Sequence, residues 1–175
     1  MNRTKWFVLV VAAQAVFLLG WAGWHEHIRG TAPIILLQTH PIDPRDLLRG
    51  DYLMLNYDIS TPPLPAELRW EGKRPAAAAV RSGTEVCVVL ARRGRYYEAM
   101  RVTREEPLVA PDEIWVHGTL ADPRRGRVTY GIEEYFVPEG KGAPPFGAHI
   151  EVEASVSSSH RLYVHRVLVE GKNYP

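Results

Sequence analysis

Four carboxylates form the grouping in this 175-residue chain that could do chemistry: Asp51, Glu133, Glu134 and Glu139. Glycoside hydrolysis needs two carboxylates at a fixed separation, and carboxylate oxygens are also ligands for Ca²⁺. Tyr135 directly follows Glu134, so an aromatic ring lies beside the acids. The grouping therefore leaves two hypotheses open, a carboxylate-dependent hydrolase and a ligand-binding groove. The alternative is that Glu133 and Glu134 are ordinary surface charges.

Three further groupings have simpler structural interpretations. Residues 25–27 (His-Glu-His) have metal-ligand spacing but directly follow an apolar run, where polar side chains face a membrane interface. His149, Glu151 and Glu153 alternate along one predicted strand, and a water-facing strand surface explains them. Residues 157–160 place serines beside a histidine without an acid to orient it, which favours a turn.

The composition excludes several classes of protein. Lys and Arg total 21 against 20 for Asp and Glu, so the chain lacks the basic character of a nucleic-acid-binding protein. The single cysteine, Cys87, excludes an internal disulfide, and its apolar neighbours indicate an unreactive core residue. The sequence contains no Walker A, GxGxxG, HExxH or GxSxG pattern, so we expect no cofactor and no metal centre.

A hydrophobic run at residues 6–24 predicts a transmembrane signal anchor, about 28 Å long as a helix. Arg3 and Lys5 precede the run, which favours a cytoplasmic segment 1–5 and an extracytoplasmic domain 25–175. We therefore expect a single-pass inner-membrane protein with most of the chain in the periplasm. A cleaved signal peptide is the alternative, although the Ala-Gln-Ala at 13–15 lies in the middle of the run. A buried helix of a soluble protein and self-association through small residues of the run also stay open.

The rest of the chain is predicted to be mainly β, an antiparallel β-sandwich or a partly open barrel behind the single helix. Short runs rich in apolar and β-branched residues predict strands at 34–39, 52–57, 85–91, 96–104, 113–120, 127–130, 149–156 and 161–169. The proline-rich stretch 60–79 interrupts them, and we expect an excursion there with one short helix at 66–70.

A single helical turn is predicted just before the second strand. Asp43 can cap it, Pro44 suits the first helical position and Asp46 stands where a capping partner would be. Gly50 suits the left-handed residue that ends such a turn, with Arg49 before it. These five residues are therefore interpreted as a structural turn.

Residues 50–57 read GDYLMLNY and match every fixed position of the GDYXXLXY motif. Residues 41–49 and 130–140 also resemble recurrent stretches of the family that bears this motif. The resemblance implies an uncharacterised bacterial membrane-anchored protein, of a kind often encoded beside polytopic membrane proteins. The family supplies no catalytic residues.

The order of anchor, apolar strand, proline-containing turn and Gly-Asp also resembles type I signal peptidases. Those enzymes need a serine before the turn and a lysine base, whereas this chain has Thr39-His40-Pro41 at the corresponding place. A lysine base needs burial, and the three lysines beyond the anchor lie in polar or terminal contexts. A degenerate scaffold without the chemistry is the interpretation that this resemblance allows.

A non-enzymatic accessory module is the favoured interpretation, a β domain that binds a polytopic membrane-protein partner or an envelope ligand. Its predicted binding groove is lined by Asp51, Tyr52, Tyr57, Glu134 and Tyr135. The carboxylate-dependent hydrolase stays as the alternative.

Overall fold

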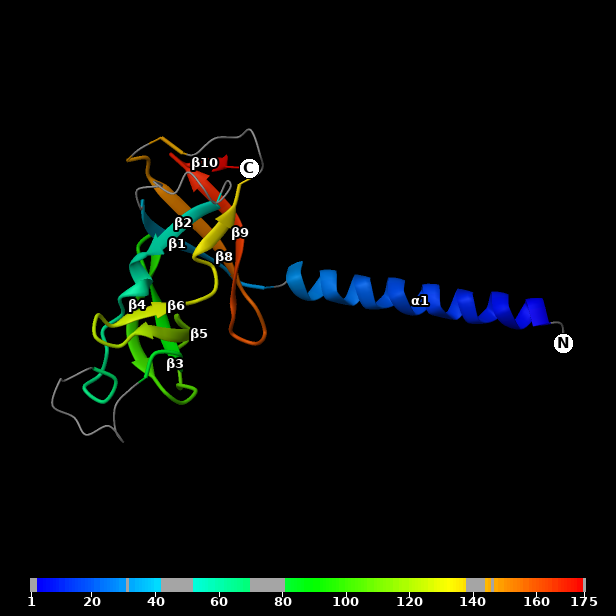
Figure 1. Ribbon diagram of the computed structural model, residues 1–175, viewed down its shortest axis with the longest axis horizontal. Helices are drawn as coiled ribbons and strands as arrows, with labels where there is room; N and C mark the ends of the chain where they lie inside the picture. Colours follow the sequence, from blue (N-terminus) through cyan, green and yellow to red (C-terminus); the bar gives the residue numbers. More distant parts are fainter. Residues whose placement is uncertain are drawn as a thin grey trace. The chain divides into compact units, whose positions relative to one another are not determined.

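The computed structural model describes residues 3–30, 32–41, 52–69, 81–137, 144–145 and 147–174. The chain divides into two units, Met1–Ala32 and Pro33–Pro175. The first contains a single helix, and the described strands all belong to the second (Figure 1).

The helix α1 (Arg3–Gly30) contains the predicted apolar run and continues six residues beyond it. Within it, Trp6–Gly23 is long enough and apolar enough to cross a membrane. Its large side chains are exposed around the whole circumference; Phe7 and Leu19, for example, are 69% and 73% exposed. A helix that is apolar on every side needs a surrounding apolar phase, which a lipid bilayer provides. The helix therefore fits the expected membrane anchor.

The described strands form two curled antiparallel sheets, each a half-barrel, so the mainly β prediction is confirmed. The six-stranded sheet has the order β10–β9–β8–β1–β2–β7, with the bounds β1 (Ile34–Pro41), β2 (Tyr52–Tyr57), β7 (Glu134–Phe136), β8 (Ile150–Val156), β9 (Leu162–Val169) and β10 (Lys172–Tyr174). The four-stranded sheet has the order β4–β3–β5–β6, with the bounds β3 (Thr84–Arg93), β4 (Tyr96–Thr103), β5 (Glu113–Asp122) and β6 (Arg127–Thr129). The short helix η1 (Asp58–Ser60) follows β2.

The four-stranded sheet is built from one continuous stretch of chain, 84–129, which lies in sequence between β2 and β7 of the other sheet. Short turns join β3 to β4 and β5 to β6, and Gly94 takes the predicted left-handed conformation in the β3–β4 turn at a φ of 61°. One sheet is therefore an insertion within the other.

The core lies between the two sheets and takes apolar side chains from both. Val86, Val88 and Leu90 of β3 belong to this main cluster. The alternate residues Cys87 and Val89 face the other way and pack with Trp115 in a second, smaller cluster. Because β3 is buried on both faces, its sequence reads as a continuous apolar run rather than an alternating one.

Three details differ from the sequence prediction. β7 forms in a segment that was not among the predicted strands. β10 was not predicted; it forms because Glu170 and Gly171 both adopt positive φ (50° and 73°), as a two-residue hairpin turn requires. In the described part of the proline-rich stretch, Leu64 and Leu68 are buried in the main core, so these residues are packed rather than an excursion.

Candidate functional site

A groove of about 1030 Å³ lies where strands of both sheets meet. Its walls come from β2, β5, β6, β7 and the beginning of β9, so residues more than a hundred positions apart in sequence share it. Half-exposed apolar side chains, Met54 of β2 and Tyr163 of β9, stand at its sides. The groove is the concave feature of the described chain to which we assign binding.

The groove is lined by charges of both signs. Arg125 lies 3.8 Å from Asp122, and Arg127 reaches the side-chain oxygen of Asn56 at 3.5 Å. The Glu133 carboxylate accepts two backbone N–H groups. The other three charged lining residues have side chains with no hydrogen-bond or ion-pair partner among the described residues: Glu85, Glu134 and Arg161. These side chains are free to pair with a bound molecule.

Glu134 is the predicted groove residue that the structure places on this surface. It stands opposite Met54 in the β2–β7 pairing, with its side chain exposed. Tyr135 pairs with Leu53 on the other face of the sheet and packs against the main core. The backbone of Tyr52 pairs with that of Phe136. The strand alternation thus separates Tyr135 from Glu134.

Tyr57 lies in the core, with 1% of its surface exposed, rather than in the groove. Its hydroxyl donates a hydrogen bond of 2.7 Å to the carbonyl of Ile132. Burial, with the nearby Glu133 carboxylate, raises the pKa of Tyr57 well above its usual range. The tyrosine that ends the GDYXXLXY-like stretch is therefore a structural tie.

The segment just before β7 is held by four further hydrogen bonds. The Glu133 carboxylate accepts the backbone N–H groups of Tyr130 at 2.5 Å and Gly131 at 2.8 Å. The Tyr130 hydroxyl donates to the carbonyl of Ile59 at 2.6 Å, and burial raises the pKa of that phenol. Leu55 N–H donates to the Glu133 carbonyl at 2.7 Å. Glu133 is thus occupied in fixing the chain that presents Glu134.

The remaining predicted residues fall outside the described part of the chain. They are Asp51 and Glu139 of the carboxylate grouping and the turn residues Asp43, Pro44, Asp46, Arg49 and Gly50.

Thr39 stands at the position that the resemblance to signal peptidases compares with their serine. It is buried, and its hydroxyl donates to the Ile150 carbonyl at 2.7 Å. His40 lies beside it in β1 and contacts Asp58 at 2.8 Å.

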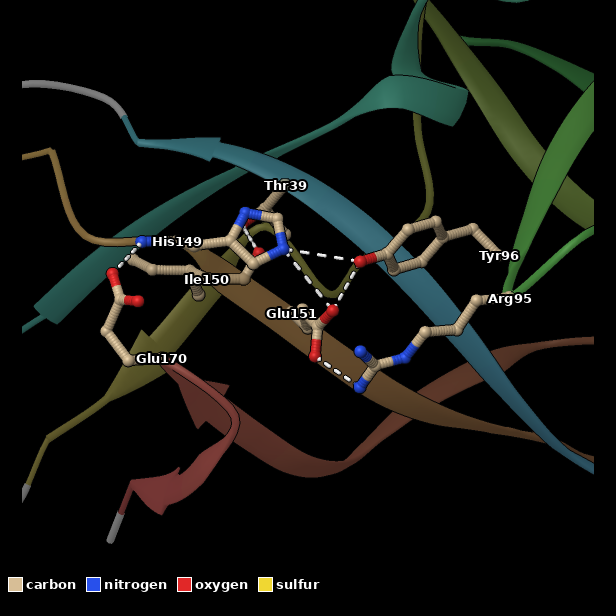
Figure 2. Close-up of polar contacts among 7 residues, drawn as sticks. All are labelled: Thr39, Arg95, Tyr96, His149, Ile150, Glu151 and Glu170. Atoms are coloured by element: carbon tan, nitrogen blue, oxygen red, sulfur yellow. Dashed lines mark hydrogen bonds and ion pairs between the residues drawn. The ribbon is translucent and has the colours of Figure 1, made fainter.

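A second polar cluster surrounds Glu151 of β8, which sequence alternation placed in water. That prediction is wrong, since Glu151 is 2% exposed. Figure 2 shows Arg95 and Tyr96 extending from the β3–β4 hairpin to its carboxylate. The Arg95 guanidinium is 2.9 Å from Oε2, the Tyr96 hydroxyl donates to Oε1, and His149 Nε2 is 3.3 Å from Oε1. Glu151 is thus bonded by side chains from the other sheet, which the alternation along its own strand does not reveal.

The Glu151 cluster connects the two sheets through charge-assisted hydrogen bonds. The hydrogen bond to Glu151 raises the pKa of Tyr96. His149, half exposed, is held against the same carboxylate, so its ring is oriented. The one part of this cluster that stands out in the sequence is the basic run 92–95 on the hairpin. Nothing in that run indicates that a buried acid is its partner.

The turn between β8 and β9 directly precedes the groove-lining residues 161–164, and the prediction of a turn at 157–160 is confirmed. His160 has a φ of 55°, a conformation rare for residues other than glycine. Its ring stacks on Trp115 with centroids 3.7 Å apart, and its carbonyl accepts the His117 N–H at 2.8 Å. These contacts fasten the start of β9, with Arg161, to the edge of β5.

Among the described residues, no three His, Cys, Asp or Glu side chains are grouped to hold a metal ion.

Cys87 is buried in the second core cluster, and burial raises the pKa of its thiol, which keeps it protonated and unreactive at neutral pH.

The family model described as GDYXXLXY protein matches residues 14–165. No curated protein and no solved structure matches the chain.

Proposed function

Because the chain belongs to the GDYXXLXY family, with a match over most of its length, we propose that it is a membrane-anchored binding module. In this proposal α1 holds the protein in the inner membrane with a cytoplasmic N-terminus, and the β domain works in the periplasm. The groove between the sheets binds a polytopic membrane-protein partner. The observation that carries the proposal is the set of uncompensated charges in that groove, Glu85, Glu134 and Arg161.

The arrangement of those charges supports binding rather than group transfer. Glu133, one of the carboxylates considered for hydrolysis, is committed to two backbone N–H groups. The Glu134 side chain is exposed and has no partner in the described chain, so it is available for an ion pair with a bound protein. Exposed charges on a surface contribute mainly to specificity and to the rate of association.

The anchor is tested by washing membranes that contain the full-length protein with alkaline carbonate and measuring its intact mass. An anchored protein stays in the membrane fraction and retains residues 1–24. Release of the protein, or a mass that lacks these residues, contradicts the anchoring part of the proposal.

The groove is tested by mild-detergent purification of the full-length protein with two charge reversals, Glu134→Lys and Arg161→Glu. We expect each to lower recovery of a stoichiometric membrane-protein partner about tenfold, equivalent to about 1.4 kcal/mol. Matched controls are Glu105→Lys and Arg104→Glu, which reverse exposed charges outside the groove lining. Equal loss in the controls, or no loss in the groove variants, contradicts the assignment.

A further inference from the structure

The helix α1 carries one amide side chain within its apolar span. Gln14 lies at the centre of Trp6–Gly23, about 12–14 Å from either end, and the span contains no charged residue. The Gln14 side chain is exposed and has no hydrogen-bond partner among the described residues. A polar group without a hydrogen bond is costly in an apolar phase, so this amide needs a partner inside the membrane.

Gln14 belongs to a strip of large side chains along α1. Phe7, Val10, Gln14, Phe17 and Trp21 are spaced alternately by three and four residues, so they share one face of the helix. The rings of Phe17 and Trp21 have their centroids 6.0 Å apart, as neighbours on that face should. This spacing is the heptad pattern with which two helices pack as a left-handed pair, in membranes as well as in water.

We propose that α1 pairs with α1 of a second copy of this chain, through the strip that carries Gln14. An amide has both donor N–H groups and an acceptor oxygen, so two Gln14 side chains can each donate to the other across a two-fold axis. A single polar residue in a heptad strip also fixes the register of the two helices. This inference rests on the membrane anchoring proposed above and adds a dimer to it.

The helix favours a second copy over an unrelated helix as the partner. The span has no charge for a charged partner to neutralise, whereas a neutral amide is matched by another amide. Two copies enter the membrane in the same orientation, so their Gln14 side chains lie at the same depth. The small residues Ala12, Gly20 and Gly23 lie on the other side of the helix, so this pairing does not use them.

The pairing face can be tested by disulfide formation in membranes that contain the full-length chain. Val10→Cys places a thiol on the Gln14 strip, and Val16→Cys, the matched control, places one on the opposite side of the helix. Cys87 is buried, so the chain without a new cysteine gives the background. A disulfide forms only between Cα atoms about 4.4–6.8 Å apart, so the product reports close contact.

The amide itself is tested with two substitutions in the Val10→Cys chain. Gln14→Leu removes the amide but keeps the span apolar, so the anchor is retained. We expect oxidation to link two copies through Val10→Cys, to leave Val16→Cys at the background, and Gln14→Leu to lower the linked product about three- to tenfold. Gln14→Asn is the matched control that keeps an amide, and it should leave the product within about twofold.

The other outcomes separate this inference from the proposed function. No linked product, or equal product from Val10→Cys and Val16→Cys, overturns the pairing if the chain is retained in membranes after an alkaline carbonate wash. Equal product with and without Gln14→Leu contradicts the role of the amide. A product that mass spectrometry assigns to this chain and a different protein overturns the choice of a second copy. Release of the unsubstituted chain by the wash contradicts the proposed anchoring itself.

Discussion

Arg95 and Glu151 meet at 2.9 Å although they belong to different sheets, and their side chains are 63% and 2% exposed. The Arg95 side chain is therefore largely in water, whereas the Glu151 side chain is buried. Loss of Glu151 leaves Arg95 in water, whereas loss of Arg95 leaves a carboxylate inside the protein without its cation. The free energy of unfolding should therefore be more sensitive to the loss of Arg95 than to the loss of its ion pair as such from the Glu151 side.

We expect Arg95→Ala to lower the free energy of unfolding by about 1–3 kcal/mol, the cost of removing a partner from a buried polar group. Arg93→Ala is the matched control, because Arg93 is exposed on the same hairpin and its side chain has no partner in the described chain. Urea unfolding of the β domain in the full-length protein measures both. Equal stability of the two variants would contradict a role for the cation.

Tyr96 makes stability depend on alkaline pH. The hydrogen bond to Glu151 raises its pKa above the ordinary value of 10.0. The stabilisation is therefore complete below about pH 10 and is lost as pH rises through the folded-state pKa. We expect Tyr96→Phe to lower stability by about 1 kcal/mol at pH 8 and to show a smaller loss than the wild type between pH 8 and 11. Unfolding curves at both pH values measure the loss of stability in each protein. Equal losses in the wild type and the variant would contradict the prediction.

Gly118 is required by close packing between β5 and β6. A Cβ atom there would lie 2.5 Å from Cγ1 of Val128 and 3.2 Å from Cε1 of Tyr130. We expect Gly118→Ala to cost about 1–3 kcal/mol, the usual range for overpacking a core. Adding Val128→Ala should recover part of this loss, because it removes the clashing methyl. Thermal unfolding of both singles and the double variant measures the coupling, and strict additivity would contradict the packing argument.

Glu133 and Glu134 are adjacent but have opposite roles. Glu133→Ala frees two backbone N–H groups, and we expect it to cost about 1–3 kcal/mol. Glu134→Ala should leave stability unchanged within about 0.5 kcal/mol while reducing partner recovery. Unfolding and co-purification of the two variants separate the roles; a stability loss at Glu134 as large as at Glu133 would contradict the assignment.

Local patterns in the sequence were sufficient to predict the helix α1 and eight of the ten described strands, all except the three-residue strands β7 and β10. Tyr57 was predicted to line the groove, but its core position could have been read from the sequence. Leu53, Leu55 and Tyr57 alternate as one apolar face of β2. Tyr135 joins that same face through its pairing with Leu53, a register that no single strand reveals.

The groove and the buried Glu151 could not be predicted in this way. Each depends on which strands of two sheets come together, and that information is not carried by the periodicity of one strand. Glu151 has the alternation of a water-facing residue, and only the hairpin that carries Arg95 changes its environment. The two sites therefore arise from tertiary packing rather than from local sequence.

From the insertion of one sheet within the other we predict the order in which the domain folds. β3 to β6 are contiguous in sequence, so their turns close short loops at low entropic cost. The bond from Tyr57 to Ile132 spans 75 residues and closes a loop that contains that entire sheet. Contacts of such long range form slowly unless the intervening chain is already compact. The ties that present Glu134 are thus late events of folding, and the groove is completed only when the inserted sheet has formed.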